Sequence, residues 1–328
     1  MEGRDQGTFR ERISRNRRNS LLLIAAFLAF ITIFGYIIGY AWLGDPVRAI
    51  AGLAFALVVG VIAGLISYYA GDRMVLAASR AREITHEEAP VLFNVVEEMS
   101  IASGLPMPKV YIVDDSAPNA FATGRDPEHA TVAVTSGLLE KLDRDELQGV
   151  MAHEMSHVAN FDIRYSMLVG ILVGTTVLIS DFFLRGLWFG GGRGGGRRGG
   201  DGGGQVQLIM MVVAIVLAIL APLFARLLQL SISRQREFLA DATAVRLTRN
   251  PKGLADALQK ISGDSEVLEA ANRATAHLYI VNPIKQFEKR SKGLFSTHPP
   301  IEERIQILRA IEAGGVAETS GQTSTETP

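Results

Sequence analysis

The chain has 328 residues, a mean hydropathy of +0.21 and a formal net charge of −1 at pH 7. That hydropathy is too high for an ordinary soluble enzyme, and the length is enough for one catalytic domain together with membrane spans. The chain contains no cysteine, which excludes disulfides and cysteine-ligated structural metal sites. The near-neutral charge by itself indicates no partner, and we expect no nucleic acid.

The first 70 residues predict a basic tail followed by a transmembrane hairpin. Residues 1–20 carry six arginines, which favour the cytoplasmic side of a membrane. Residues 21–70 contain the apolar runs Leu21–Leu43 and Ala49–Tyr69, each of about 20 residues, the length of a transmembrane helix. The first run is too long for the apolar part of a signal peptide and lacks a convincing cleavage site, so we interpret it as an anchor. Two crossings return the chain to the cytoplasm.

Residues 71–164 predict the first part of a cytoplasmic catalytic domain of the α+β class. Thr85–Ser103 has apolar residues at helical spacing. Short strands are predicted at Lys109–Val113, Asn119–Thr123 and Thr131–Thr135. One interpretation treats the last two strands as a core hairpin. The other has one edge pair with an extended peptide through five substrate-strand candidates, Asn119, Ala120, Phe121, Ala122 and Thr123.

The segment His153-Glu154-Met155-Ser156-His157 is the strongest indication of chemistry in the chain. Positions four apart lie on one face of a helix, so both imidazoles can point at one metal ion. Glu154 lies beside the first histidine, where it can accept a proton from water. Zinc metalloproteases have this arrangement, with the metal as Lewis acid and the glutamate as general base. The alternative is a pair of surface histidines on an amphipathic helix.

The residues before this segment predict a well-started helix. Asp143 and Glu146 have the spacing of a capping box, as N-cap residue and third helical residue. Leu142 and Leu147 flank them at the two positions of a hydrophobic staple. The histidines therefore fall on the middle turns of the helix, where their backbone is rigid.

A second transmembrane pair is predicted after the histidine segment, over residues 165–184 and 206–230. Its apolar runs are Tyr165–Leu184 and Val206–Ala225, which bring the number of predicted transmembrane helices to four. A Gly/Arg-rich loop at residues 185–205 would lie outside. Because its arginines oppose the positive-inside tendency, a re-entrant pair is the alternative. We interpret the loop as a flexible linker in preference to a site for RNA or lipid headgroups.

The second part of the catalytic domain is predicted at residues 231–312. A catalytic zinc needs a third protein ligand and an open coordination position. The candidates are the remaining histidines and the downstream acids, among which Glu237 and Asp241 lie four apart in a polar helical stretch. The alternative for this pair is a solvated helix face, paired with Arg234 or Lys252.

The end of the chain predicts helices at Gly253–Ile261 and Ile301–Ile311. Residues 313–328 are rich in Ser, Thr and Glu, which predicts a disordered tail. An even number of crossings separates His157 from Glu237, so all candidate ligands would lie on the cytoplasmic side.

Several short segments resemble one known family. The similar segments are Pro118–Gly124, Ala159-Asn160, Glu237 with Asp241, and Ser296–Pro300 with Arg304. They are similar to motifs of HtpX-type membrane zinc metalloproteases, in the family that also holds the eukaryotic CAAX prenyl endopeptidase. The resemblance runs from about Thr85 to Arg309. It implies a zincin-like, mostly helical α+β metalloprotease domain with a small β-sheet.

The same resemblance implies roles for single residues. His153, His157 and Glu237 would bind one Zn²⁺ per chain, and Glu154 would act as the catalytic base. Asp241 would orient a ligand from behind. Further candidates near the metal or the transition state are Asn160, His298 and Arg304. For His298 and Arg304 the alternative is a Pro-Pro turn that opens the last helix.

The function that the resemblance implies is that of a zinc metalloendopeptidase in quality control. Its substrates would be misfolded or damaged membrane proteins, cut on the cytosolic side of a prokaryotic plasma membrane under stress. A prenyl-peptide protease and a non-catalytic zinc-binding membrane scaffold are the alternatives. An intramembrane protease fits less well, because the polar segment Asp143–Glu146 precedes the histidines. The expected partners are the lipid bilayer and polypeptides, while the oligomeric state and the cleavage preference stay open.

Overall fold

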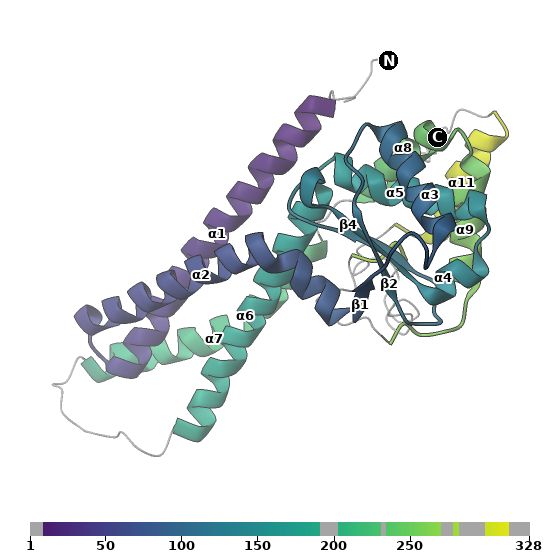
Figure 1. Cartoon of the computed structure of the whole chain (residues 1–328). Helices are drawn as coiled ribbons and strands as arrows, with labels where there is room; N and C mark the ends of the chain where they lie inside the picture. The colour runs from purple at the N-terminus through teal and green to yellow at the C-terminus, as the bar shows by residue number, and fades with distance from the viewer. Residues whose placement is uncertain (1–8, 191–202, 231–233, 270–277, 282–298, 315–328) are drawn as a thin grey trace, which may run out of the picture.

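The structure is a computed structural model that describes residues 9–190, 203–230, 234–269, 278–281 and 299–314. Figure 1 shows the long helices grouped on one side and a small sheet with shorter helices on the other. His298, residues 191–202 of the Gly/Arg-rich loop and residues 315–328 of the predicted tail lie outside the described residues.

The N-terminal hairpin consists of α1 (Phe9–Leu43) and α2 (Pro46–Ala78). The Asp45 side chain caps α2 by accepting a hydrogen bond of 2.7 Å from the Arg48 N–H, and Pro46 occupies the first helical position, where it needs no N–H partner. A Cβ atom on Gly52 would lie only 2.7 Å from the Gly35 carbonyl oxygen. The two helices therefore pack backbone against backbone, as small residues allow in membranes.

Two further long helices, α6 (Asp162–Gly190) and α7 (Gly203–Leu230), pack beside this hairpin. Among the described residues, three segments are long and apolar enough to cross a membrane, namely Ile24–Leu43, Pro46–Ala78 and Asp162–Arg185. Within α7 the described apolar stretch is the shorter Leu208–Ala221. Three of the four predicted spans are therefore matched by length and composition, while the fourth stays a prediction.

The sheet contains β1 (Ala81–Glu83), β2 (Lys109–Val113), β3 (Ala120–Thr123) and β4 (Thr131–Thr135), in the order β1-β2-β4-β3. The β2–β4 pair is parallel, and the β1–β2 and β3–β4 pairs are antiparallel. The three predicted strands are present, although β3 begins one residue later than predicted. Strand β1 was not predicted, because three half-exposed residues carry no readable alternation. As the last strand in the order, β3 lies at an edge of the sheet.

The first helix of the soluble part is shorter than predicted. It is α3 (Pro90–Ser103), whereas the prediction began at Thr85. A proline disfavours helical conformation in the residue before it, so Ala89 ends the preceding turn. In that turn the Thr85 N–H donates a hydrogen bond of 2.8 Å to the Glu88 carboxylate. Helical periodicity had masked this boundary.

The remaining elements are the 3-10 turn η1 (Pro127–His129) and α4 (Ser136–Lys141), α5 (Arg144–Ala159), α8 (Arg234–Thr248), α9 (Pro251–Gly263) and α11 (Ile301–Glu312). The main core joins the helices α3, α5, α9 and α11 to one face of the sheet. A Cβ atom on Gly149 would lie 2.7 Å from the Leu254 backbone nitrogen, so α5 and α9 touch backbone to backbone. Phe121 and Ala133 lie in a second cluster that also contains Val75 of α2. Helix α5 is thus packed against α3, α8, α9 and β3, which hold it on several sides.

Candidate active site

Helix α5 carries the two histidines, and its start is the predicted one. The Asp143 side chain accepts a hydrogen bond of 3.0 Å from the Glu146 N–H, and the Glu146 side chain accepts one of 2.8 Å from the Asp143 N–H. These two bonds are the capping box, and Leu142 and Leu147 are buried beside it. Lys260 of α9 lies 2.7 Å from the Glu146 carboxylate. Local and tertiary contacts together therefore hold the helix that positions the histidines.

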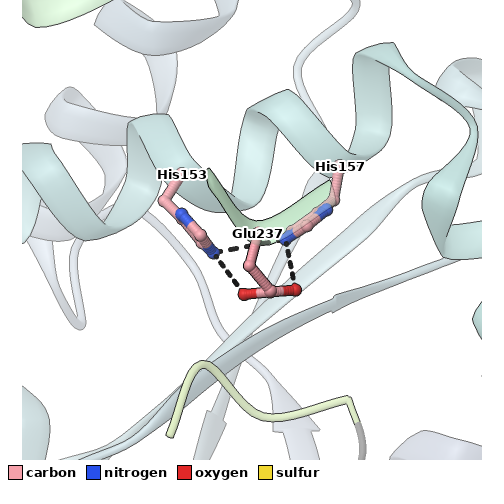
Figure 2. Close-up of side chains that lie close together, drawn as sticks. All are labelled: His153, His157 and Glu237. Atoms are coloured by element: carbon pink, nitrogen blue, oxygen red, sulfur yellow. Dashed lines mark hydrogen bonds and ion pairs between the residues drawn. The ribbon is translucent and has the colours of Figure 1, made fainter. Parts of the chain in front are cut away.

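His153 and His157 project from the same face of α5 towards one point (Figure 2). Their Nε2 atoms are 3.2 Å apart, and their rings meet edge to face with centroids 4.8 Å apart. The His153 side chain is 1% exposed. A surface pair on an amphipathic helix does not describe this arrangement.

Helix α8 brings Glu237 to the same point. Its carboxylate oxygens lie 3.6 Å from the Nε2 atom of His153 and 3.6 Å from that of His157. Glu237 is buried, as is Asp241 one turn further along. The solvated helix face that sequence allowed for these two acids is therefore absent, and Lys252 instead pairs with Asp256 at 2.6 Å.

The three side chains match zinc in donor type, number and spacing. One ligand atom from each can be chosen so that all lie within 4.8 Å of one another. Ligands at zinc bond lengths in a tetrahedron are about 3.3 Å apart, close to the 3.2 Å and 3.6 Å separations found here. A set of three protein ligands with one position left over is typical of catalytic zinc, whereas structural sites usually have four.

A carboxylate behind each imidazole fixes its orientation. Asp241 lies 2.9 Å from Nδ1 of His153, and Asp162 lies 3.1 Å from Nδ1 of His157. Each Nε2 is therefore left to face the common point, and such partners also strengthen an imidazole as a ligand. Asp162 was not among the predicted site residues. The available signal was an acid five residues after His157, at the first position of α6.

Arg304 of α11 closes the cluster from the side of Asp241. Its guanidinium is fully buried and donates hydrogen bonds of 2.7 Å and 2.8 Å to the two Asp241 oxygens. It also lies 3.7 Å from the Glu237 carboxylate. Burial would raise the pKa of Asp241, but Arg304 outweighs it and lowers that pKa to about 2. Conversely, Asp241 and Glu237 hold the pKa of Arg304 above its ordinary value.

The carboxylates also act on the imidazoles. Burial by itself would lower the pKa of His153, but the hydrogen bonds of Asp241 and Glu237 outweigh it and raise that pKa to about 9. For His157, burial is likewise outweighed by Asp162 and Glu237, and the pKa is raised. In the metal-free protein His153 therefore carries a proton at neutral pH. A cation that binds here must displace protons.

Glu154 lies on α5 beside the sheet edge. It is buried, and its carboxylate accepts a hydrogen bond from the backbone N–H of Ala122 in β3. Burial raises the pKa of Glu154, against the opposing effect of His153 and His157. A buried carboxylate beside a metal-binding group suits proton transfer near neutral pH.

The substrate-strand candidates divide into two sets. Ala120 and Ala122 belong to the core cluster on the α5 side, whereas Phe121 belongs to the opposite cluster, where its ring meets Tyr279 at 5.0 Å. Thr123 is buried at the end of β3, and Asn119 lies just before the strand, where its carbonyl accepts a hydrogen bond of 3.0 Å from the Thr135 N–H.

Part of the β3 edge is already paired. The Ala120 carbonyl accepts a hydrogen bond of 2.9 Å from the Ile280 N–H, and the Asn119 side chain donates one of 2.9 Å to the Val281 carbonyl. Arg304 donates a hydrogen bond of 3.2 Å to the Ile280 carbonyl. The sequence offered no signal for this pairing of a distant segment with the predicted strand. Asn160, another predicted candidate, is the buried C-cap residue of α5.

Two histidines and a glutamate lie at metal-ligand spacing, with a buried glutamate and a sheet edge beside them. This arrangement fits a metalloprotease site. The long apolar helices define its class further as a membrane metalloprotease. The chain belongs to peptidase family M48, whose sequence profile matches residues 86–312. The resemblance noted in the sequence is thereby confirmed.

Relatives in bacteria match almost the whole chain. The "Protease HtpX homolog" of Listeria monocytogenes serotype 4b (strain CLIP80459) is 46% identical over 302 residues, which are 91% of this chain and 98% of the relative. That of Ligilactobacillus salivarius is 43% identical over 298 residues, with the same shares. The crystal structure of S. mikatae Ste24p covers 90% of this chain and 66% of its own, with 19% identity and a TM-score of 0.43.

Proposed function

We propose that this protein is a zinc-dependent endopeptidase that cuts misfolded or damaged membrane proteins at the cytoplasmic face of a prokaryotic plasma membrane. The observation that carries the proposal is the convergence of His153, His157 and Glu237 from two helices on one point. These residues would hold Zn²⁺. The bound ion would supply a Lewis acid for the peptide carbonyl and for the attacking water.

Glu154 is the proposed general base and general acid. It takes a proton from the attacking water and later delivers it to the leaving amine. Burial raises the pKa of Glu154, which makes its carboxylate a stronger proton acceptor. Asp241 and Asp162 hold the two imidazoles in place, and Arg304 keeps Asp241 ionised.

The substrate is proposed to add a strand to the open part of the β3 edge. The outward carbonyl of Ala120 is taken by Ile280, so pairing would begin at Ala122 and run towards Gly124. The backbone of Ala122 already contacts Glu154, which brings the paired peptide next to the proposed base. Main-chain pairing of this kind accepts many sequences, as quality control requires.

The proposed division of the chain follows from the packing. Residues 71–164 and 231–312 would form the two parts of the catalytic domain, and the packing of α5 against α8 and α9 supports this division. A zinc scaffold is disfavoured by the three-ligand set with its open position. A prenyl-peptide protease would need an apolar chamber at the site. An apolar cavity of about 430 Å³ lies among α1, α2 and α6, around Trp42 and Phe183, and none of the residues that line it belongs to the site.

The first test compares wild-type protein, purified in detergent and loaded with zinc, with Glu154→Gln in cleavage of an unfolded protein such as casein. We expect the variant to keep its zinc and to lose about 10²–10⁴-fold in turnover, the usual contribution of such a base. Exposed Glu97→Gln on α3 is the matched control. Full activity of Glu154→Gln would refute its role, and inactive wild type with bound zinc would favour the scaffold.

The second test concerns the orientation in the membrane. Because the chain has no cysteine, a single introduced cysteine can be labelled without background from other thiols of the protein. Ala102→Cys, exposed on α3, should react with an impermeant maleimide only after the cells are opened, whereas Val47→Cys, exposed in the first turn of α2, should react in intact cells. The reverse pattern would overturn the cytoplasmic placement of the site.

A further inference from the structure

Two arginines from separate parts of the chain meet where the membrane helices join the soluble body. Arg125 lies in the β3–β4 turn, and Arg164 lies in the first turn of α6. The Nε–H group of Arg164 donates a hydrogen bond to the Arg125 carbonyl. The Arg164 guanidinium lies 5.7 Å from the Tyr68 ring, and that of Arg125 lies 5.6 Å from the Tyr69 ring. We call these four residues the arginine–tyrosine cluster.

The lengths of the apolar helices indicate that the cluster lies near one membrane boundary. Tyr68 and Tyr69 follow the start of α2 at Pro46 by a helical distance of about 34 Å, slightly more than a hydrocarbon core of about 30 Å. The span of α6 begins at Asp162, so Arg164 also lies near its end. Tyrosines favour this interfacial depth, where their rings are in apolar surroundings and their hydroxyls in water.

The charges of the cluster do not balance. Within the part of the chain that the structure describes, no carboxylate lies within ion-pair distance of Arg164. Arg236, which stacks similarly on Tyr165, instead pairs with Asp162 at 3.4 Å. Arg125 is 3.5 Å from Asp126. One carboxylate therefore faces two guanidinium groups, and the cluster keeps an excess of positive charge.

We propose that the arginine–tyrosine cluster binds the phosphate headgroup of an anionic phospholipid. Guanidinium groups bind phosphate through paired N–H donors, and stacking on tyrosine does not use such donors. Nε of Arg164 donates to the Arg125 carbonyl, and Nη2 of Arg125 lies 2.6 Å from Nε2 of His129, so the two Nη groups of Arg164 are the donors that would face the phosphate. An acyl chain attached to the headgroup would continue along the apolar surfaces of α2 and α6. Because Arg125 follows β3 by two residues, the bound lipid would also hold the turn next to the proposed substrate edge.

The test measures lipid binding directly, so it does not depend on zinc or on proteolysis. Delipidated full-length protein in detergent would be titrated with phosphatidylglycerol or with phosphatidylcholine, and bound lipid counted by native mass spectrometry. We expect a preference for phosphatidylglycerol that falls about fivefold in Arg125→Gln and about fivefold in Arg164→Gln, from about 1 kcal/mol for each charge near a membrane surface. Inorganic phosphate at the same concentration should not displace the lipid.

The matched control is Arg185→Gln, at the opposite end of α6, where Arg185 pairs with Asp181 at 2.7 Å. Its lipid preference should equal that of wild type. If Arg164→Gln does not fold, Arg125→Gln and the charge-conserving Arg164→Lys carry the test, with the latter keeping most of the preference. An equal preference in Arg125→Gln, Arg185→Gln and wild type would overturn the proposal. Displacement by inorganic phosphate would also overturn it, because the site would then recognise free phosphate.

Discussion

Helices α5 and α8 contribute to the same cluster, but they are held in different ways. The start of α5 is stabilised by hydrogen bonds between residues three apart, and its two histidines share a face by helical geometry alone. The direction of α8 depends on residues far along the chain, because Asp241 is held by Arg304 of α11. Two ligands are therefore set locally, while the third depends on the tertiary structure.

Removing the third ligand tests this difference between α5 and α8, and it should have the largest effect. Loss of a residue that only orients a ligand typically lowers metal affinity about 10–100-fold. We expect Glu237→Ala, which removes a ligand itself, to lower zinc affinity by more than that. Helix α5 should stay folded, since its capping box and its apolar core contacts do not involve Glu237. Metal analysis of detergent-purified protein measures the effect, with Glu97→Ala as control. Near-stoichiometric zinc in the variant would show that another residue completes the site.

Weakening the support of α8 should have the next largest effect. Arg304→Gln would leave Asp241 buried without its charge partner, a change that typically costs about 3–5 kcal/mol of folding stability. We also expect zinc affinity to fall about 10–100-fold, because Asp241 orients His153. Thermal unfolding and a chelator competition measure the two effects. The half-buried Arg309 on the same helix pairs with Asp256 and Glu312. Arg309→Gln should change both quantities much less, and an equal change in both variants would contradict the role of Arg304.

The smallest and most graded effect should come from pH. The pKa of His153 in the metal-free protein is raised to about 9. Its imidazolium therefore stabilises the metal-free fold fully below the unfolded pKa of about 6.5, and this contribution is lost as the pH rises through about 9. Zinc must displace that proton, so zinc affinity should rise by about tenfold per pH unit up to about pH 9. A chelator competition from pH 6 to 9 measures it, and a flat profile would mean that both histidines are already neutral.

Much of the site could be read from residue spacing. The H-E-x-x-H segment, the capping box before it and the β3–β4 hairpin depend on neighbours within a few positions, and the structure has all of them. Resemblance to known motifs pointed to Glu237, Asp241 and Arg304, which the structure brings to the histidines. Strand β1 and the start of α3 were missed, because short exposed strands and proline boundaries leave a weak periodic signal.

By itself, the sequence determined that a helix presents two histidines and a glutamate next to one another, and that apolar runs flank the domain. Helical periodicity and capping arise from backbone geometry, so they are legible without the fold. Only the tertiary structure decided that Arg304 holds Asp241 behind His153 and that Ile280 pairs with the edge of β3. Those contacts join residues through packing across the core, and packing partners leave no fixed spacing along the chain.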